Sequence, residues 1–136
     1  MMDIHKAGLL TLRDNRILLC RKNKDTDLLI LPGGKFDGEE SAQECLEREI
    51  AEEVGSVSIQ NPEYIATYSD KAAGNLSKTV QIELYKGDLV GVPIAQAEIA
   101  ELIWFGPEDD RALLSPVLAN RIVPDLIARK ILDWAA

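Results

Sequence analysis

The sequence predicts a mixed-sheet fold of the α/β or α+β class, in which helices pack on a layer of strands. Three observations lead to this prediction: several short apolar runs bounded by turn residues, an amphipathic helical pattern over residues 41–54, and a second helical pattern near the C-terminus. The chain has 136 residues, of which 46% are apolar and 28% charged. We therefore expect a single domain over residues 1–136 with its own core.

The first predicted elements form a β-hairpin. Residues 7–13 (AGLLTLR) and 16–22 (RILLCRK) are apolar runs on either side of Asp14 and Asn15, which favour a tight turn. A third apolar run, 28–31 (LLIL), ends at the sequence PGG, which indicates a turn.

A helix is predicted to begin after Ser41 and to end before Gly55. Ser41 is a good N-cap, and Glu44 three residues later completes a capping box. Gly55 is suited to the C′ position, where a positive φ ends many helices. One stripe of this helix can face the core; it consists of Ala42, Cys45, Leu46, Ile50 and Val54.

The second half of the chain predicts strands followed by a helix. Residues 57–69 and 78–86 read as strands, and the polar segment 69–78 (SDKAAGNLSK) between them reads as a mobile loop. Residues 101–105 (ELIWF) indicate another short strand. Pro124 suits the first turn of a C-terminal helix. The residues that recur at the 3–4 residue spacing of that helix are Leu126, Ile127, Lys130, Ile131 and Trp134.

Composition excludes several classes of protein. A net charge of −8 and a pI near 4.6 disfavour stable nucleic-acid binding, which relies on clustered Lys and Arg. No apolar stretch reaches the roughly 18 residues of a membrane span, and the N-terminus does not resemble a secretory signal. We expect a cytoplasmic protein. Cys20 and Cys45 lack metal-type spacing and are expected to be buried, reduced thiols.

The predicted helix carries an unusual concentration of acids. Glu49, Glu52 and Glu53 lie at i, i+3 and i+4, so their carboxylates share one face and repel one another. Arg48 can offset part of this repulsion by pairing along the helix. One interpretation is a solvated acidic face without chemistry. The other is a site for Mg²⁺ or Mn²⁺, which prefer oxygen ligands and leave room for water and phosphate.

The spacing of these residues resembles the Nudix hydrolase family. Its motif reads G-x5-E-x7-R-E-U-x-E-E-x-G-U, where U is a bulky aliphatic residue. Here Gly34 is followed after five residues by Glu40, and seven residues later by 48–55 (REIAEEVG). The chain departs only at the last position, where Ser56 replaces an aliphatic residue and no candidate ligand is lost. The motif covers 23 residues, and the surrounding strands and terminal helix are also similar to the family.

The resemblance implies a fold and a set of roles. The fold would be an α/β/α sandwich with a mixed central sheet, a loop–helix–loop carrying the motif, and a C-terminal helix. Glu49, Glu52 and Glu53 would be ligands of Mg²⁺, or of Mn²⁺, and one of them could assist the attacking water. Arg48 would orient them. Glu40 would support the loop–helix–loop, and Gly34 and Gly55 would serve the backbone.

A further acid from a later loop commonly joins the metal site in this family. Glu98 is the first candidate and Glu101 the alternative; an exposed, inactive acid is equally compatible with either position.

The resemblance also implies a small-molecule nucleotide substrate. The sequence PGGK before the motif looks like the MutT-type branch, which cleaves (deoxy)nucleoside triphosphates to the monophosphate and pyrophosphate. ADP-ribose, nucleotide sugars and dinucleoside polyphosphates are alternative substrates, and a non-catalytic nucleotide-binding module is the alternative function. The expected substrate contacts are Arg21 and Lys35 for phosphate and Asn120 for the base. Lys22 and Lys24 could add phosphate contacts. A homodimer is compatible with the family.

Overall fold

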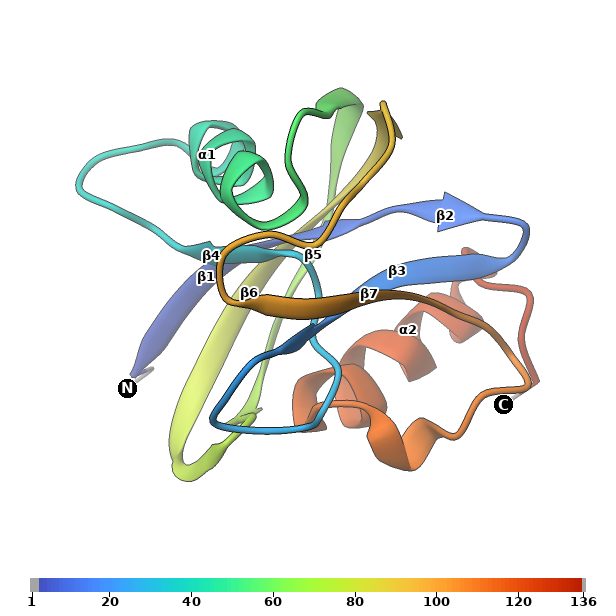
Figure 1. The fold of residues 1–136 in the computed structure, drawn as a ribbon. Helices are drawn as coiled ribbons and strands as arrows, with labels where there is room; N and C mark the ends of the chain where they lie inside the picture. The colour runs from blue at the N-terminus through green and yellow to red at the C-terminus, as the bar shows by residue number, and fades with distance from the viewer. Residues whose placement is uncertain (1–2, 136) are drawn as a thin grey trace.

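The computed structural model describes residues 3–135 and shows two sheets and two helical layers (Figure 1). The larger sheet has the order β4-β1-β6-β5. Strands β4 (Gly33–Lys35), β1 (Ile4–Leu10), β6 (Asn75–Val90) and β5 (Ser58–Ala72) form it. β1 pairs with β6 in parallel, whereas β1–β4 and β5–β6 are antiparallel, so the sheet is mixed as predicted.

The smaller sheet is antiparallel and has the order β2-β3-β7. Its strands are β2 (Leu12–Arg13), β3 (Arg16–Lys22) and β7 (Ile99–Phe105). The predicted hairpin is present, because Arg13 pairs with Arg16 across a two-residue turn. Asp14 and Asn15 have φ of 50° and 62°, the left-handed conformations that such a turn needs. The predicted strand at 101–105 is confirmed as the C-terminal part of β7.

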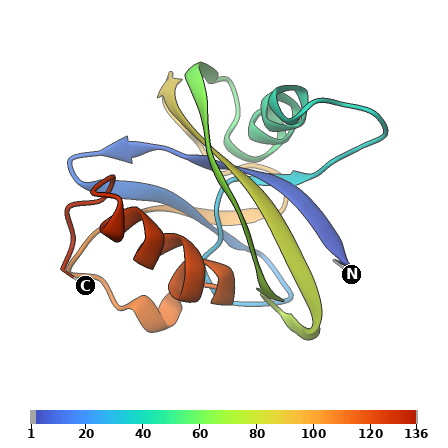
Figure 2. The same cartoon turned by 180° about the vertical axis from the view of Figure 1, so that it is seen from behind.

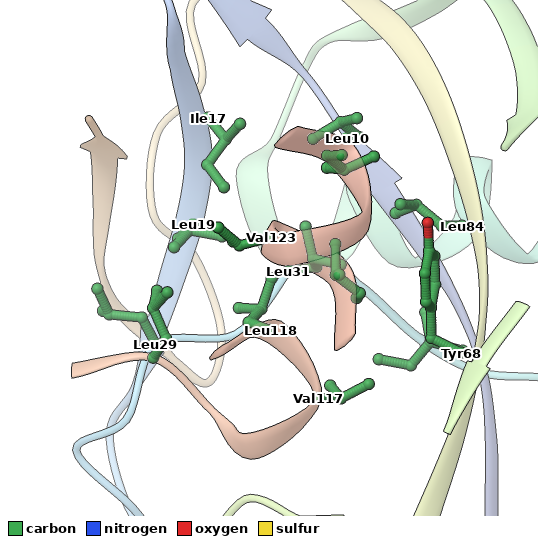
Figure 3. Packing of buried hydrophobic residues seen from close by; sticks show 14 of the residues in the cluster. Leu10, Ile17, Leu19, Leu29, Leu31, Tyr68, Leu84, Val117, Leu118 and Val123 are labelled. Carbon is green, nitrogen blue, oxygen red and sulfur yellow. The ribbon is translucent and has the colours of Figure 1, made fainter. Parts of the chain in front are cut away.

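Helices cover the sheets from opposite sides, which confirms the predicted sandwich (Figures 1 and 2). α1 (Ala42–Val54) packs on one side with a core cluster that includes Cys45, Leu46 and Ile50. The helical turns η2 (Leu118–Ile122) and α2 (Val123–Ala128) pack on the other side. Between these turns and the sheets lies the larger of the two core clusters, to which both sheets and the turns contribute buried residues (Figure 3). Both cysteines are buried and unpaired, as predicted.

The predicted caps fix the ends of α1. The Ser41 side chain accepts a hydrogen bond from the Glu44 N–H at 3.1 Å, and the Glu44 carboxylate accepts one from the Ser41 N–H at 2.8 Å. Gly55 follows the last helical residue with φ of 85°, a conformation that is costly for residues with a Cβ. The helix therefore begins and ends at the residues predicted from its sequence.

The prediction of a mobile loop over residues 69–78 was wrong. β5 and β6 continue through it as a hairpin, with Asp70 opposite Val80 and Lys71 opposite Thr79. Strand pairing satisfies the backbone of this polar segment, and the Ala72 side chain within it is buried. Only a short turn at Gly74, with φ of 80°, separates the strands.

The C-terminal helical run begins and ends earlier than predicted. Helical structure runs over residues 116–128 and ends where Lys130 adopts a φ of 59°. Pro124 lies inside this run, where its ring and missing N–H disrupt the bond to the carbonyl four residues earlier. The chain widens into a π-helical turn there, and the Val123 N–H bonds to the Leu118 carbonyl. Trp134 is buried beyond the helix. No helix in residues 3–135 is long and apolar enough to cross a membrane.

Candidate active site

A polar cavity of about 300 Å³ lies where β1, β3, β4 and α1 meet the segment before β7. Its carboxylates are Glu49, Glu52, Glu53 and Glu98. Its ammonium groups are Lys6, Lys22 and Lys35. Four carboxylates and three ammonium groups leave a formal charge of −1, so acids and bases that are far apart in the sequence converge on one site.

Glu53 is the deepest of these carboxylates. The residue is 9% exposed, and its Oε1 accepts a hydrogen bond from the Gly33 N–H at 2.8 Å. Burial raises the pKa of Glu53 to about 7; the neighbouring Glu49 charge adds to the rise, and the Gly33 hydrogen bond opposes it. A carboxyl group with a pKa near neutrality can exchange protons under physiological conditions.

Arg48 holds the surrounding acids in place. Its guanidinium donates to Glu49 Oε1 at 2.8 Å, and to Glu40 Oε2 at 3.1 Å and Oε1 at 2.5 Å. Glu52 lies 3.8 Å away, one helical turn further on. Arg48 also donates to the Lys35 carbonyl at 3.0 Å, which ties α1 to β4. The hydrogen bonds that Arg48 donates to Glu40 lower the pKa of the Glu40 carboxyl to about 2.

The structure separates the two candidates for the additional acid. Glu98 lines the polar cavity, and its backbone carbonyl accepts a hydrogen bond from the Asn23 N–H at 2.8 Å. Glu101 lies in β7 opposite Arg21, and the two side chains pair at 2.8 Å. Glu101 and Arg21 are therefore occupied with each other, and neither lines the polar cavity.

A second, more apolar cavity of about 100 Å³ adjoins the first. Ile4, Leu31, Val80, Ile82, Val117 and Leu118 supply its apolar wall. Lys6, Lys22 and Gly33 line both cavities and so mark their junction. Ser115 also lines the apolar cavity; its Oγ is buried and has no hydrogen-bond partner within residues 3–135.

The other predicted substrate residues are placed differently. Lys35 lines the polar cavity. Asn120 lines neither cavity, and its side-chain amide donates to Asp70 Oδ2 at 3.1 Å. The side chain of Lys24 also lies outside both linings. Of the site residues predicted from sequence, the four glutamates and Lys35 lie together, and Arg48 lies directly behind them.

Sequence reasoning missed Lys6, Gly33 and Ser115. Lys6 stands in an otherwise apolar strand sequence, IHKAGLL, and that interruption was the available signal. Ser115 had no comparable signal, because a serine before a proline at a helix start is ordinary capping sequence. Its burial and missing partner are visible only in three dimensions.

The donor chemistry of the polar cavity fits a hard divalent cation. All four acids offer carboxylate oxygens, which Mg²⁺ and Mn²⁺ prefer. Glu53 has a raised pKa because its charge is buried, and a bound cation would compensate that charge. As they stand, no three acidic, His or Cys side chains of the described chain surround one common point.

Comparisons with known proteins identify the family of the chain. The family model described as the NUDIX domain matches residues 4–125. The structure is similar to the ORF135 protein of E. coli, with 25% identity, TM-score 0.72, and 96% of this chain and 94% of that chain covered. It is also similar to a MutT Nudix hydrolase from Burkholderia pseudomallei, with 26% identity, TM-score 0.74, and coverage of 90% and 95%. No curated protein matches the sequence.

A Nudix hydrolase from Nitrosomonas europaea shares the fold at 21% identity, with a TM-score of 0.75 and 97% of each chain covered. The family match spans most of the chain, the structural relatives include MutT-type proteins, and three glutamates of the motif line one cavity. The chain therefore belongs to the Nudix family and is a hydrolase that acts on phosphoric anhydride bonds.

Proposed function

We propose that this chain hydrolyses a nucleoside diphosphate linked to another moiety, and specifically a (deoxy)nucleoside triphosphate, to the monophosphate and pyrophosphate. One observation carries the proposal: the carboxylate-lined cavity and the apolar cavity meet at Lys6, Lys22 and Gly33. A single ligand with an apolar ring at one end and a polyphosphate at the other matches this pair of cavities. The domain would act as a unit over residues 1–136.

The polar cavity supplies the ligands for Mg²⁺, with Mn²⁺ as the alternative. Glu49, Glu52, Glu53 and Glu98 would hold the ion. When bound, it offsets negative charge on the phosphate oxygens and makes water more acidic. One divalent ion would change the formal charge of the cavity lining from −1 to +1, so an acidic protein can bind a polyanion at this point.

The chain's own residues would position the reactants and accept a proton. Glu53, the most buried of the four carboxylates and fixed by the Gly33 N–H at 2.8 Å, is suited to take the proton from the water that attacks phosphorus. Attack forms one P–O bond and breaks the anhydride P–O bond, and pyrophosphate leaves with the electron pair. Arg48 keeps Glu49 directed through its 2.8 Å contact, and Lys22 and Lys35 supply positive charge for the phosphates.

A substrate screen with product identification tests the proposal. Nucleoside triphosphates, ADP-ribose, nucleotide sugars and dinucleoside polyphosphates are incubated with Mg²⁺ or Mn²⁺, and products are separated by ion-exchange chromatography. We expect monophosphate and pyrophosphate from a nucleoside triphosphate. Preferential cleavage of another class would replace the substrate assignment. Binding without any product would indicate a non-catalytic module.

The location and assembly of the protein are separate expectations. We propose that it acts in the cytoplasm on small nucleotides rather than on nucleic acid, consistent with its net charge of −8. Light scattering coupled to size-exclusion chromatography distinguishes a monomer from a homodimer.

A further inference from the structure

Lys6 occupies an unusual place for a charged residue. It lies in β1, an inner strand, where it is opposite Lys35 of β4 and Ile82 of β6. Side chains alternate along a strand, so Lys6 shares its face of the sheet with Ile4 and Gly8, and all three line the apolar cavity. Its side chain also lines the carboxylate cavity. The strands on both sides fix the backbone of Lys6 at the junction.

The charge of Lys6 is poorly compensated. None of the lysines that line the polar cavity makes an ion pair within 4.0 Å inside the described chain. Burial lowers the pKa of Lys6, and the nearby charges of Lys22 and Lys35 lower it further, while Glu53 and Glu49 oppose the shift. A partly buried cation without a close counter-ion is unfavourable. An anion bound at the junction would relieve this cost.

We propose that Lys6 binds the phosphate group next to the nucleoside and thereby fixes the direction in which the substrate lies. The inference rests on the proposed nucleotide substrate and deepens it. With the nucleoside in the apolar cavity, the first phosphate reaches the junction, and the remaining phosphates extend toward Glu49, Glu52 and Glu53. The opposite orientation places the outer phosphates against the apolar side chains of Val80 and Ile82 and the nucleoside among the carboxylates of the polar cavity.

Lys6 differs from Lys22 in its suitability for this role. Both line the two cavities, but Lys22 is the last residue of β3, beside a shift in register between Arg21 and Lys22. Lys6 lies inside β1 with a strand paired on each side, so its position is better determined. Precise placement favours a residue that selects the orientation of a ligand over one that only adds charge.

The test compares nucleoside 5′-monophosphates with the corresponding nucleosides, so it requires no turnover. Isothermal titration calorimetry measures both affinities with Mg²⁺ present, for the wild-type protein, Lys6→Met, Lys6→Arg and the control Lys24→Met. Methionine keeps the length of the side chain without its charge, and Lys24 lines neither cavity. Thermal melting checks that each variant is folded.

We expect the wild-type protein to bind the monophosphate more tightly than the nucleoside. Lys6→Met should reduce this preference by about 10- to 100-fold, the range for losing a charge-assisted contact. Lys6→Arg should restore part of it, and Lys24→Met should leave it unchanged. An unchanged preference in Lys6→Met, an equal loss in Lys24→Met, or no preference in the wild-type protein would each overturn the inference.

The outcome separates the two proposals. Loss of the phosphate preference in Lys6→Met without product from any nucleotide would support the role of Lys6 and reject the hydrolytic function proposed above. Hydrolysis of a nucleotide, together with an equal phosphate preference in the wild-type protein and Lys6→Met, would support the hydrolytic function and reject the role of Lys6.

Discussion

The Glu49 carboxylate lies against the α-carbon of Gly34. A Cβ atom added at Gly34 would be 2.2 Å from Glu49 Cδ and 2.4 Å from its Oε2. Glu49 cannot simply turn away, because Arg48 holds its Oε1 at 2.8 Å. Glu49 can therefore keep its orientation in the polar cavity only because residue 34 has no side chain.

Gly34→Ala should displace Glu49 and lower metal-dependent turnover by about 10- to 100-fold, the usual effect of disturbing the support of a metal ligand. Steady-state kinetics over a range of Mg²⁺ concentrations measures the change. Gly38→Ala is a control in the segment between β4 and α1, since nothing lies within 4 Å of a Cβ there; its φ of 58° is positive, whereas that of Gly34 is not. Equal losses in both variants would show that the effect of Gly34→Ala does not come from contact with Glu49.

Glu53→Gln should lower turnover by orders of magnitude while the fold stays intact. Glutamine keeps an oxygen for the Gly33 N–H but cannot accept a proton from water or carry the charge of a metal ligand. Rates are measured under saturating Mg²⁺, and circular dichroism checks the fold. A wild-type rate would reject the role of Glu53 in the proposed reaction.

The same substitution should change metal-free stability in a pH-dependent way. The folded protein raises the pKa of Glu53 from 4.5 to about 7, so ionisation of this carboxyl is less favourable in the folded state. Ionisation of Glu53 in the wild-type protein therefore lowers the free energy of unfolding as pH rises from about 4.5 to above 7. Urea unfolding in EDTA should therefore show Glu53→Gln more stable than wild type at pH 8 and the difference smaller at pH 5.

Local sequence was sufficient where local forces decide the structure. The turn at Asp14 and Asn15 and the capping box of Ser41 and Glu44 depend on residues only a few positions apart, and both were predicted. The spacing of the acids on α1 also followed from helix geometry. These features contain most of what could be known of the site from the sequence.

Features that depend on distant partners were not predictable in this way. The segment 69–78 becomes strand because β5 and β6 pair along it, although its composition favours a loop. Gly33–Lys35 joins a sheet only because β1 offers an edge. The junction at Lys6 arises from the meeting of β1, β3 and β4 at two cavities, and no local pattern encodes that meeting.

Glu40→Gln should lower the free energy of unfolding most at neutral pH. The Arg48 contact holds the pKa of Glu40 at about 2, below its ordinary value of 4.5, so the ionised form stabilises the folded state. That contribution is present above pH 4.5 and is lost as pH falls toward 2. Urea unfolding at several pH values should show the difference from wild type shrinking below pH 4.5. A difference independent of pH would indicate lost packing rather than lost charge.

Asn120→Ala tests the base contact expected from sequence. The Asn120 amide is hydrogen-bonded to Asp70, and the side chain lines neither cavity. Because Asn120 lies outside both cavities, we expect Asn120→Ala to change kcat/KM for substrates with each of the four bases by the same factor. A change that depends on the base would support the sequence-based assignment instead.

Ser115→Ala should increase stability. Ser115 is 2% exposed, and its Oγ has no hydrogen-bond partner in the described residues. A buried polar group without a partner costs about 1–3 kcal/mol, and alanine removes the group while retaining the backbone bond from the Ser115 N–H to the Leu29 carbonyl. We expect urea unfolding to show a gain of about 1 kcal/mol, because some packing is also lost. Ser77→Ala is the control, since the Ser77 hydroxyl is exposed and bonded to Asn75 at 2.6 Å. A loss of stability in Ser115→Ala would show that the hydroxyl has a partner in solution.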